Sequence, residues 1–381
     1  MPLGADAMGS PIDGQPEIAQ FGRYDVLRVC ACPGLADRAQ NPYTWLIYQP
    51  MLARGVRLVE YRRWLPKLAP VDVLHVHWPD FVFWGRIARR HPSAGRLAAY
   101  MLLALARRVR RKGGIVVWTA HNLQPHDIGD DSWRAFFDQW RGEVDLVIHL
   151  TGAARQEFAR LYPDMARARH AVVPHPHYRT AYPAPPPRDQ ARQRLQIEPQ
   201  SRVICNIGNM RPYKRLAELV RLFRGVAQER DLLILAGECG PAYRDELVAA
   251  SGGDRRVRLQ PHRHDDEAMI ELLAASDGSV INHQTLFNSG SAILSLSFDR
   301  PVLARQQGSM AELAEKLGPH WVETFDGALP ADRLADFLDR SAAARHDEPA
   351  PLGPYDPAAV SETTLREYRD ALAARGAHLA R

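Results

Sequence analysis

Acidic residues are missing from one long stretch of this sequence. No Asp or Glu occurs between Phe81 and His126, although the whole chain of 381 residues has a net charge of only +5. The segment 86–112 instead holds the basic residues Arg86, Arg89, Arg90, Arg96, Arg107, Arg108, Arg110, Arg111 and Lys112. The pattern predicts a basic, partly amphipathic helix that is suited to an anionic membrane surface. The alternative is that these basic residues form an ordinary helix face exposed to solvent. Zinc-finger spacing, aromatic RNA-binding motifs and helix-turn-helix patterns are absent, so nucleic acid is not an expected partner.

Long apolar runs and cysteines are also scarce. The longest uncharged apolar run, LAAYMLLALA at 97–106, is about half of the ~20 residues that a membrane span requires. Residues 1–20 lack the apolar block of a secretory signal, so we expect a disordered tail and a cytoplasmic protein. The four cysteines, Cys30, Cys32, Cys205 and Cys239, show no paired metal-type spacing, and we expect them to be reduced and buried.

The chain is long enough for two domains, and its pattern changes near the middle. In the first half, apolar strand-like runs at 24–32, 56–61, 71–78, 113–121 and 144–150 alternate with helical patterns. The segment 174–190 is dense in proline and is predicted to be a stiff linker. Beyond it the strand and helix alternation restarts, and a final helical pattern follows a second proline-rich break.

This alternation predicts an α/β protein with two Rossmann-like, doubly wound domains that face each other across a cleft. The expected divisions are a tail at 1–20, an N-terminal domain at 21–173, a linker at 174–190, a C-terminal domain at 191–345, and a linker with a closing helix at 346–381. Ligands of such sheets bind beyond the carboxyl ends of the strands. The functional residues are therefore expected just after the carboxyl ends of the strands.

Two segments of the second half suit a phosphate group. In NIGNMRPYKR a strand ends near Ile207, and a turn at Gly208 and Asn209 leads to the cations Arg211 and Lys214. In FNSGSAILSLSF, Asn288 and Ser289 can cap a helix that Gly290 and Ser291 begin, and a helix start attracts anions. Both segments follow strands of one predicted sheet, so together they can flank a diphosphate.

Other phosphate-binding signals are missing. The chain has no Gly-rich loop ending in Gly-Lys-Ser/Thr, no G-x-G-x-x-G after the first strand, and no Asp-x-Asp pair. A metal-chelated diphosphate is therefore not expected, and no metal or other cofactor is predicted.

Proton-handling residues follow two strands of the first half. TAHNLQPHD contains His121, Asn122, His126 and Asp127, and HVHWPD contains His75, His77, Trp78 and Asp80. His121, Asp127 and Asp80 are each candidates for a general base near neutral pH. His75 and His77 also suit hydrogen-bonded positions in the core. Two hypotheses compete with this interpretation. One is a metal-dependent hydrolase that uses these histidines and Asp127 as ligands, and the other is a saccharide-binding protein without catalysis.

At these residues the chain resembles bacterial exopolysaccharide glycosyltransferases of GT-B architecture, and among them the xanthan-type GDP-mannose:glycolipid β-mannosyltransferase family. The segments that carry the resemblance are NPYTWLIYQPML, DVLHVHWPD, TAHNLQPHD, GNMRPYKR, HQTLFNSGSAILSLSFDRPVL and GPHWVETFDGAL. The resemblance implies that the second domain binds a nucleotide sugar, GDP-mannose, through the phosphate segments and Gln284. It also implies that the first domain binds a polyprenyl-diphosphate-linked oligosaccharide beside His77, Trp78, Asn122 and His126, on the inner face of the cell membrane.

The chain departs from related enzymes at a few positions. Many retaining GT-B enzymes carry two glutamates eight positions apart, and counting back from Pro301 places these at Leu286 and Leu294. Leucine cannot act as a carboxylate, so inversion is expected. Arg215 stands where such enzymes usually have glycine, and Asp80 and Asp127 stand where we expect glutamate. An inverting transfer needs a base in the acceptor domain, for which Asp127, His121 and Asp80 all remain open.

Overall fold

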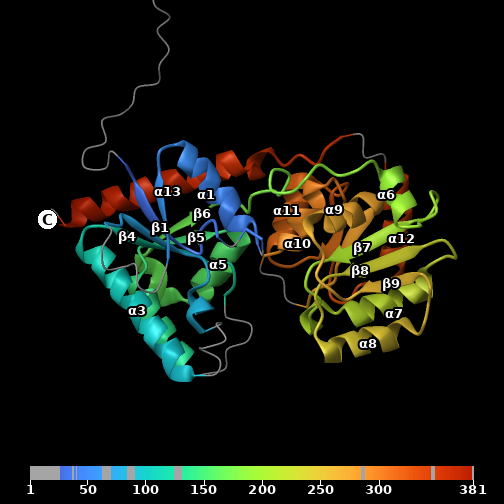
Figure 1. Cartoon of the computed structure of the whole chain (residues 1–381), viewed down its shortest axis with the longest axis horizontal. Coiled ribbons are helices and arrows are strands. Elements are labelled where there is room, and N and C mark those ends of the chain that lie inside the picture. Colours follow the sequence, from blue (N-terminus) through green and yellow to red (C-terminus); the bar gives the residue numbers. More distant parts are fainter. Residues whose placement is uncertain are drawn as a thin grey trace, which may run out of the picture.

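The computed structural model describes residues 26–36, 38–39, 41–61, 70–83, 91–123, 131–284, 288–344 and 348–379. Within these residues the strands form two six-stranded sheets, ordered β2-β1-β3-β4-β5-β6 and β12-β11-β10-β7-β8-β9. All strand pairs in both sheets are parallel. Helices cover both sheets, which lie side by side in two halves (Figure 1). The predicted pair of doubly wound α/β domains is confirmed.

The first half holds the sheet β1–β6 and its helices. Its strands are β1 (Arg28–Cys32), β2 (Arg57–Glu60), β3 (Val73–Val76), β4 (Ile115–Thr119), β5 (Leu146–His149) and β6 (Arg169–Val172). Its helices are α1 (Tyr43–Ala53), α3 (Pro92–Arg111), α4 (Asp131–Glu143) and α5 (Gly152–Leu161), with 3-10 turns η2 (Pro79–Phe83) and η3 (Pro163–Arg167).

The second half is also a parallel sheet covered by helices, but its strand order differs from that of the first half. Its strands are β7 (Val203–Ile207), β8 (Leu232–Ala236), β9 (Val257–Gln260), β10 (Gly278–Ile281), β11 (Val302–Arg305) and β12 (Val322–Phe325). Its helices are α6 (Arg188–Arg194), α7 (Leu216–Val226), α8 (Pro241–Ser251), α9 (Asp266–Ala275), α10 (Gly290–Ser297), α11 (Ser309–Leu317) and α12 (Ala331–Ala343), with η4 (Pro212–Lys214) and η5 (Gly353–Tyr355).

The last helix, α13 (Pro357–Leu379), belongs to the first half although it ends the chain. Figure 1 shows it crossing back to lie beside α1. Val360, Leu365 and Tyr368 of α13 share one buried cluster with Tyr43 and Tyr48 of α1. The closing helix predicted from the sequence therefore covers the first sheet.

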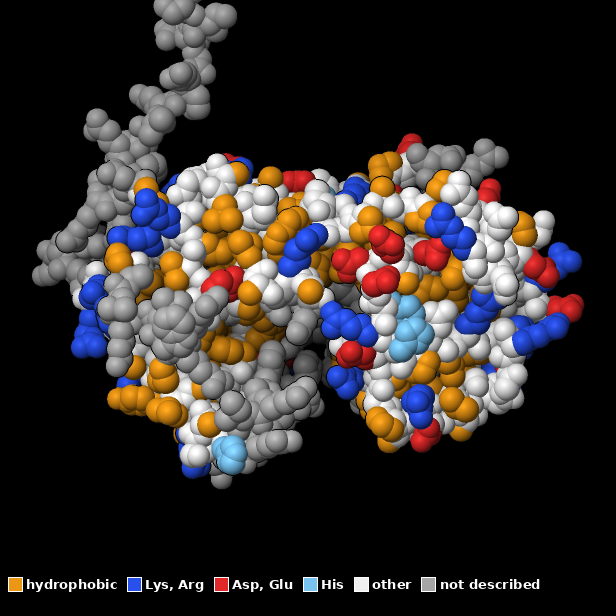
Figure 2. Space-filling view, viewed as in Figure 1, with side chains coloured by type: hydrophobic (Ala, Val, Ile, Leu, Met, Phe, Trp, Pro, Cys, Tyr) orange, Lys and Arg blue, Asp and Glu red, His pale blue; other side chains and the backbone are white. Residues whose placement is uncertain are grey.

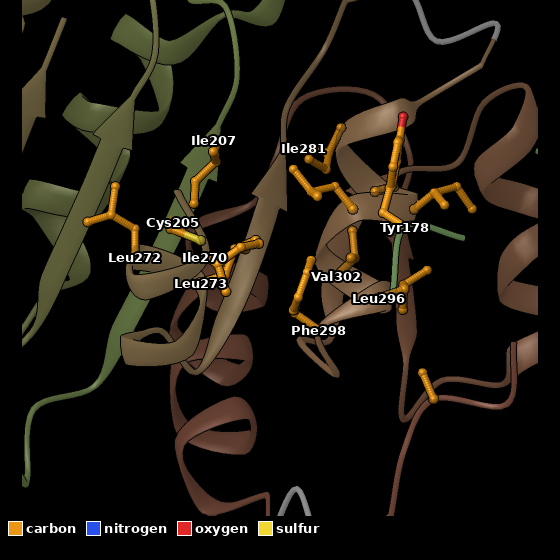
Figure 3. Packing of buried hydrophobic residues seen from close by; sticks show 14 of the residues in the cluster. Tyr178, Cys205, Ile207, Ile270, Leu272, Leu273, Ile281, Leu296, Phe298 and Val302 are labelled. Carbon is orange, nitrogen blue, oxygen red and sulfur yellow. The ribbon is translucent and has the colours of Figure 1, made fainter. Parts of the chain in front are cut away.

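The strands form because their apolar residues are buried on both faces, as parallel sheets require. β4, β7 and β8 are buried along their whole length. Figure 3 shows one face of the second sheet, where Cys205, Ile207 and Val302 pack against Leu273 and Leu296. All four cysteines are free, and all except Cys239 are buried.

Some elements carry no clear signal in the sequence. β6 and β12 have only four residues each, and their partly exposed patterns lack a continuous apolar run. The proline-dense segment is irregular from Pro174 to Pro187, and its last residues, 188–190, begin α6.

The basic helix differs from the predicted segment 86–112. α3 begins at Pro92, and residues 84–90, including Arg86, Arg89 and Arg90, lie outside the described residues. None of the helices in the described ranges combines the length and apolar character needed to cross a bilayer.

Three hydrogen bonds are among the contacts that join the halves, and Leu46 of α1 also packs in the buried cluster of the second half. Glu312 Oε2 on α11 accepts the backbone N–H of Gly152 at the start of α5, at 2.7 Å. Arg263 donates to the carbonyl of Ala39 at 2.6 Å. Asn288 Nδ2 donates to the carbonyl of His121 at 3.0 Å. The carboxyl ends of the two sheets are therefore held close together.

A buried ion pair fixes α6 to the second sheet. Asp277, just before β10, accepts from Arg192 at 2.9 Å with both oxygens, and also from Arg188 and the N–H of Val203. The Arg192 and Asp277 side chains are each 1% exposed. Removing one partner of such a pair leaves an uncompensated buried charge.

Asp277→Ala is expected to destabilise the second half by about 3–5 kcal/mol, seen as a lower midpoint of urea unfolding. The control is Asp339→Ala, since Asp339 pairs with Arg202 at the surface, 68% exposed, and such pairs contribute about 0–1 kcal/mol. Equal midpoints for the two variants would contradict a structural role for the buried pair.

Candidate functional site

Two loops of the second half pack backbone against backbone. Gly208 follows β7 and Gly237 follows β8, with φ angles of 116° and 143° that side chains rarely allow. A Cβ atom at Gly237 would lie 2.4 Å from the carbonyl oxygen of Gly208. Gly208 N–H donates to Ala236, and Met210 N–H donates to Glu238. Both glycines are therefore needed for the loops to approach, and they form the floor of a cleft.

Lys214 lies beside this floor. A Cβ at Gly208 would be 3.5 Å from both Lys214 Nζ and Ser291 Oγ, so the ammonium group, the Gly208 turn and the start of α10 converge. Lys214 is 4% exposed. Burial, and then the charge of Arg211, lower its pKa to about 8. Among the described residues no carboxylate pairs with Lys214, and a buried cation of this kind is suited to an anionic ligand.

The start of α10 faces the same space. Ser289 caps this helix by accepting the N–H of Ala292 at 3.2 Å, which leaves the first N–H groups of the helix directed toward the cleft. A Cβ at Gly290 would meet the hydroxyl of Tyr178 at 3.3 Å. The helix dipole adds partial positive charge to that of Lys214.

A cavity of about 750 Å³ lies beside the loops that contain Gly208 and Gly237. It is lined by Gly208, Asn209, Gly237, Glu238, Arg263, His264, the acidic residues 265–267 and, across the interface, Ala39. Figure 2 shows acidic and histidine side chains together on this face of the second half. Its volume is in the range of small-molecule sites, about 300–1,000 Å³.

Histidines and hydroxyl groups fill the facing edge of the first sheet. His77 Nδ1 lies 3.2 Å from His121 Nε2, and His77 Nε2 lies 2.8 Å from the hydroxyl of Tyr48. The same hydroxyl lies 2.7 Å from His75 Nδ1. Thr119 Oγ1 lies 2.7 Å from His75 Nε2. These contacts connect the ends of β3 and β4 with α1.

Burial keeps these imidazoles neutral. It lowers the pKa of His75 to about 3 and, with the neighbouring imidazoles contributing second, lowers the pKa values of His77 and His121 far below 6.5. Burial also lowers the pKa of His175 to about 4. A neutral imidazole retains a lone pair that can accept a proton.

His121 stands where the two halves meet. The Trp78 ring stacks on its imidazole with centroids 4.4 Å apart, and the Tyr43 ring meets it edge-on at 4.5 Å. Its carbonyl accepts the amide N–H of Asn288, one residue before the cap of α10. The structure therefore brings the first half's His121 close to the second-half segment that is predicted to bind phosphate.

The remaining predicted residues divide into three groups. Arg211, Asn209 and Gln284 are exposed around the second-half loops, and the N–H of Gln284 donates to the carbonyl of Tyr213. Asp80, in η2, is 7% exposed and lines a small cavity with His77, Trp78, Asn122 and Trp133. His126 and Asp127 lie outside the described residues.

Several residues at the site carry no clear sequence signal. Tyr43 and Tyr48 lie inside α1, and His175 and Tyr178 fall in the segment predicted to be a linker. His283 is 5% exposed, and burial, followed by the charge of Lys214, lowers its pKa to about 3. The sequence shows only that His283 begins the HQTLFNSG segment. Its burial beside Lys214 depends on the fold.

The backbone conformation of Arg215 is one that favours glycine, the residue expected at this position. Its φ of 52° and ψ of 37° place it in the left-handed region, which glycine occupies without strain. The Arg215 side chain pairs with Glu218, and its carbonyl lies 3.4 Å from the amide nitrogen of Asn282. The turn is thus kept with arginine in place.

The histidine cluster does not offer a set of metal ligands. His75 and His77 use both ring nitrogens in hydrogen bonds with hydroxyl groups and with His121. Over the described ranges, no three His, Cys, Asp or Glu side chains are arranged to hold a metal ion. The hydrogen-bonded arrangement favours proton handling over ligation.

No protein-family model matches the sequence. Two curated relatives, both named GDP-mannose:glycolipid 4-beta-D-mannosyltransferase, from Xanthomonas campestris pv. campestris, are 29% and 28% identical over 344 residues. Each match covers 88% of this chain and 90% of the relative.

Solved structures share the fold at lower identity. A sucrose-phosphate synthase from Thermosynechococcus elongatus superposes with a TM-score of 0.65 at 16% identity, covering 91% of this chain and 100% of that one. Anabaena HepE in complex with UDP-glucose gives a TM-score of 0.61 at 15% identity, covering 91% and 99%.

The paired sheets and these relatives define the chain as a glycosyltransferase of GT-B architecture. The resemblance to the GDP-mannose:glycolipid β-mannosyltransferase family, indicated by the sequence motifs, is confirmed over nearly the whole chain.

Affinity for a nucleoside diphosphate is expected to fall as the pH rises above about 8. Only protonated Lys214 attracts the diphosphate, and its pKa in the free protein is about 8, so above that pH binding must be accompanied by proton uptake. The dissociation constant should then rise by up to roughly tenfold per pH unit. Calorimetric titration with GDP and UDP on both sides of this pH measures the effect.

Lys214→Met tests the role of this ammonium group, because methionine has a side chain of similar length and no ionisable group. It should bind weakly, with an affinity that no longer falls across this pH range. A wild-type affinity that is flat through the same range would contradict the role of Lys214.

Proposed function

We propose that the protein is an inverting glycosyltransferase that moves mannose from GDP-mannose to a polyprenyl-diphosphate-linked oligosaccharide during assembly of an exopolysaccharide repeat. The names of the two curated relatives support the donor and the glycolipid acceptor. The single observation that carries the proposal is the hydrogen bond from Asn288 to the carbonyl of His121. It sets a proton acceptor directly beside the helix start that suits a diphosphate.

The donor would lie along the second sheet. Its diphosphate is placed at Gly208, Lys214 and the start of α10, where positive charge converges. The nucleoside is placed in the 750 Å³ cavity that continues past Gly237 and Glu238. Lys214, Arg211 and the helix N–H groups then neutralise the leaving group, so the proposal requires no metal.

The acceptor would approach from the first half. The Trp78 ring, half-buried and stacked on His121, offers an apolar face for a sugar. The acceptor hydroxyl attacks the anomeric carbon, the bond from that carbon to the diphosphate oxygen breaks, and the hydroxyl proton passes to the base. We assign the base to His121, since it is the described candidate that contacts the donor half.

The residues of α10 support inversion. Leu294, at one of the two positions where retaining enzymes carry glutamate, is 9% exposed and packs in the apolar cluster beneath the site. Leu286, at the other position, lies outside the described residues. A direct displacement uses no carboxylate on that side of the sugar.

The donor assignment is tested with a panel of nucleotide sugars and a membrane glycolipid extract. GDP-mannose should be consumed without added metal, giving a β-linked product by NMR. Arg211→Ala combined with Lys214→Ala should lower GDP affinity by at least about 100-fold, because each charge-assisted contact contributes roughly 1.5–3 kcal/mol. Arg230→Ala with Arg255→Ala, two exposed arginines of the same half, should bind GDP like the wild type. Undiminished GDP binding by the first double variant would overturn the donor site, and consumption of UDP-sugars alone would overturn the choice of nucleotide.

We further propose that α3 places the first half on an anionic membrane surface. Leu97 and Tyr100 on its outer face are 60% and 66% exposed, with Arg96, Arg111 and Lys112 exposed on the same helix and its end. Figure 2 shows hydrophobic and basic side chains where Figure 1 places α3. Arg107 and Arg110 instead pair with Glu143 and Asp145, which reduces their availability to lipid.

Leu97→Ser with Tyr100→Ser is expected to reduce flotation with vesicles that contain anionic lipid, because exposed apolar side chains anchor an interfacial helix. The control is Val248→Ser, an exposed apolar residue of α8 in the second half, 55% exposed. Equal flotation of both variants and the wild type would contradict this membrane face.

A further inference from the structure

A chain of buried hydrogen bonds runs from His121 into the first half. It passes from His121 Nε2 to His77 Nδ1 at 3.2 Å, from His77 Nε2 to the Tyr48 hydroxyl at 2.8 Å, and from that hydroxyl to His75 Nδ1 at 2.7 Å. His75, His77 and Tyr48 are each at most 1% exposed. Water therefore does not reach these three residues as an alternative donor or acceptor.

The chain can run in one of two directions, because a neutral imidazole carries one N–H and one lone pair. His75 Nε2 lies 2.7 Å from Thr119 Oγ1, and its Nδ1 faces the hydroxyl groups of Tyr48 at 2.7 Å and Tyr368 at 2.5 Å. In one of these directions, His75 donates its Nε2–H to Thr119 and presents a lone pair at Nδ1, toward Tyr48.

Each following bond then has one consistent direction. Tyr48 donates to His75 Nδ1, so its oxygen accepts the Nε2–H of His77. His77 Nδ1 is left as a lone pair and accepts the Nε2–H of His121. His121 Nδ1, to which no described residue is hydrogen-bonded, is then a lone pair. If Tyr48 donated to His77 instead, every bond would reverse and His121 Nδ1 would carry a proton.

We propose that Tyr48 and His77 are positioning residues that hold His121 in the tautomer whose Nδ1 accepts the proton of the acceptor hydroxyl. The inference rests on the proposed function, in which His121 is the base. The hydrogen bond on one ring nitrogen of a histidine decides which form the other nitrogen takes. Tyr48 acts through His77 and touches no substrate.

Tyr368 of α13 provides a matched control for Tyr48. Its hydroxyl lies 2.5 Å from the same His75 Nδ1 and is also hydrogen-bonded to Tyr48. Its side chain is equally buried, but no hydrogen bond joins it to His77, so the Tyr48–His77 bond does not depend on it. Tyr368→Phe removes the competing hydroxyl and leaves Tyr48 as the donor to His75. Tyr48→Phe removes the only hydroxyl between His75 and His77 among the described residues.

The test compares these two phenylalanine variants in the full chain. Tyr48→Phe should lower kcat by at least about tenfold, within the 10²–10⁴-fold that a general base contributes, with GDP affinity and the KM for GDP-mannose unchanged. Tyr368→Phe should keep wild-type kcat. A wild-type kcat in Tyr48→Phe, or an equal loss in both variants, would overturn the proposal.

Histidine NMR gives a readout that does not depend on activity. In ¹⁵N-histidine-labelled protein, the ring signals of His121 should show a proton on Nε2 in the wild type and in Tyr368→Phe. In Tyr48→Phe they should show a mixture of tautomers. A proton on Nδ1 in the wild type, or an unchanged tautomer in Tyr48→Phe, would overturn the positioning role even if kcat falls.

His121→Ala separates this inference from the proposed function. It should lose transfer by about 10²–10⁴-fold while GDP still binds. If His121→Ala remains active, His121 is not the base. The hydrogen bonds from His121 to His75 then have no role in catalysis, whichever tautomer the NMR shows. If His121→Ala is inactive and Tyr48→Phe is fully active, the base assignment stands and only the positioning role fails.

Discussion

The parallel direction of the strands is the constraint on which the site depends. A parallel sheet places the carboxyl ends of all its strands at one edge, so the polar residues that follow different strands must gather there. In the first sheet this edge holds His77 and His121, and in the second it holds Gly208 and the start of α10. The hydrogen bond between Asn288 and the carbonyl of His121 joins these two edges. Segments that are far apart in the sequence thereby become neighbours.

Burial acts on the ionisable groups at both edges. At the edge of the first sheet it lowers the pKa of each histidine, so the imidazoles are neutral at neutral pH and are weaker bases than a free histidine. At the edge of the second sheet it lowers the pKa of Lys214 to about 8, so this group remains mostly charged at neutral pH and an anionic ligand would stabilise its charge. One physical effect therefore leaves neutral imidazoles on one wall and, among the described residues, a cation without a carboxylate partner on the other.

The sequence predicts the parts of the fold that have strong periodicity. Continuous apolar runs predict β4, β7 and β8, which are buried along their whole length. β6 and β12 escape prediction because they are short and partly exposed, so that no apolar run marks them. Strand ends are also predictable, so the motifs predict that Lys214, Gly208, Ser289 and His121 lie near the carboxyl ends of the strands, as the structure shows.

What the sequence does not show is how side chains from distant elements combine. Tyr48 belongs to an apolar helix pattern and looks like a core residue, yet its hydroxyl joins two histidines. His175 and Tyr178 lie in a proline-rich segment, yet Tyr178 reaches the start of α10. Such contacts have no local periodicity or spacing, because they depend on how the helices pack over the sheet.

α13 shows that the site also depends on residues far away in the sequence. Tyr368 contacts His75 from 293 positions along the chain, and Val360 and Leu365 of the same helix pack with α1. α1 carries Tyr43 beside His121 and Tyr48 beside His77. α13 follows the last strand of the second half in the sequence, yet it packs on the first half. The geometry around His121 is thus a product of the whole chain, and neither half contains all the residues that determine it.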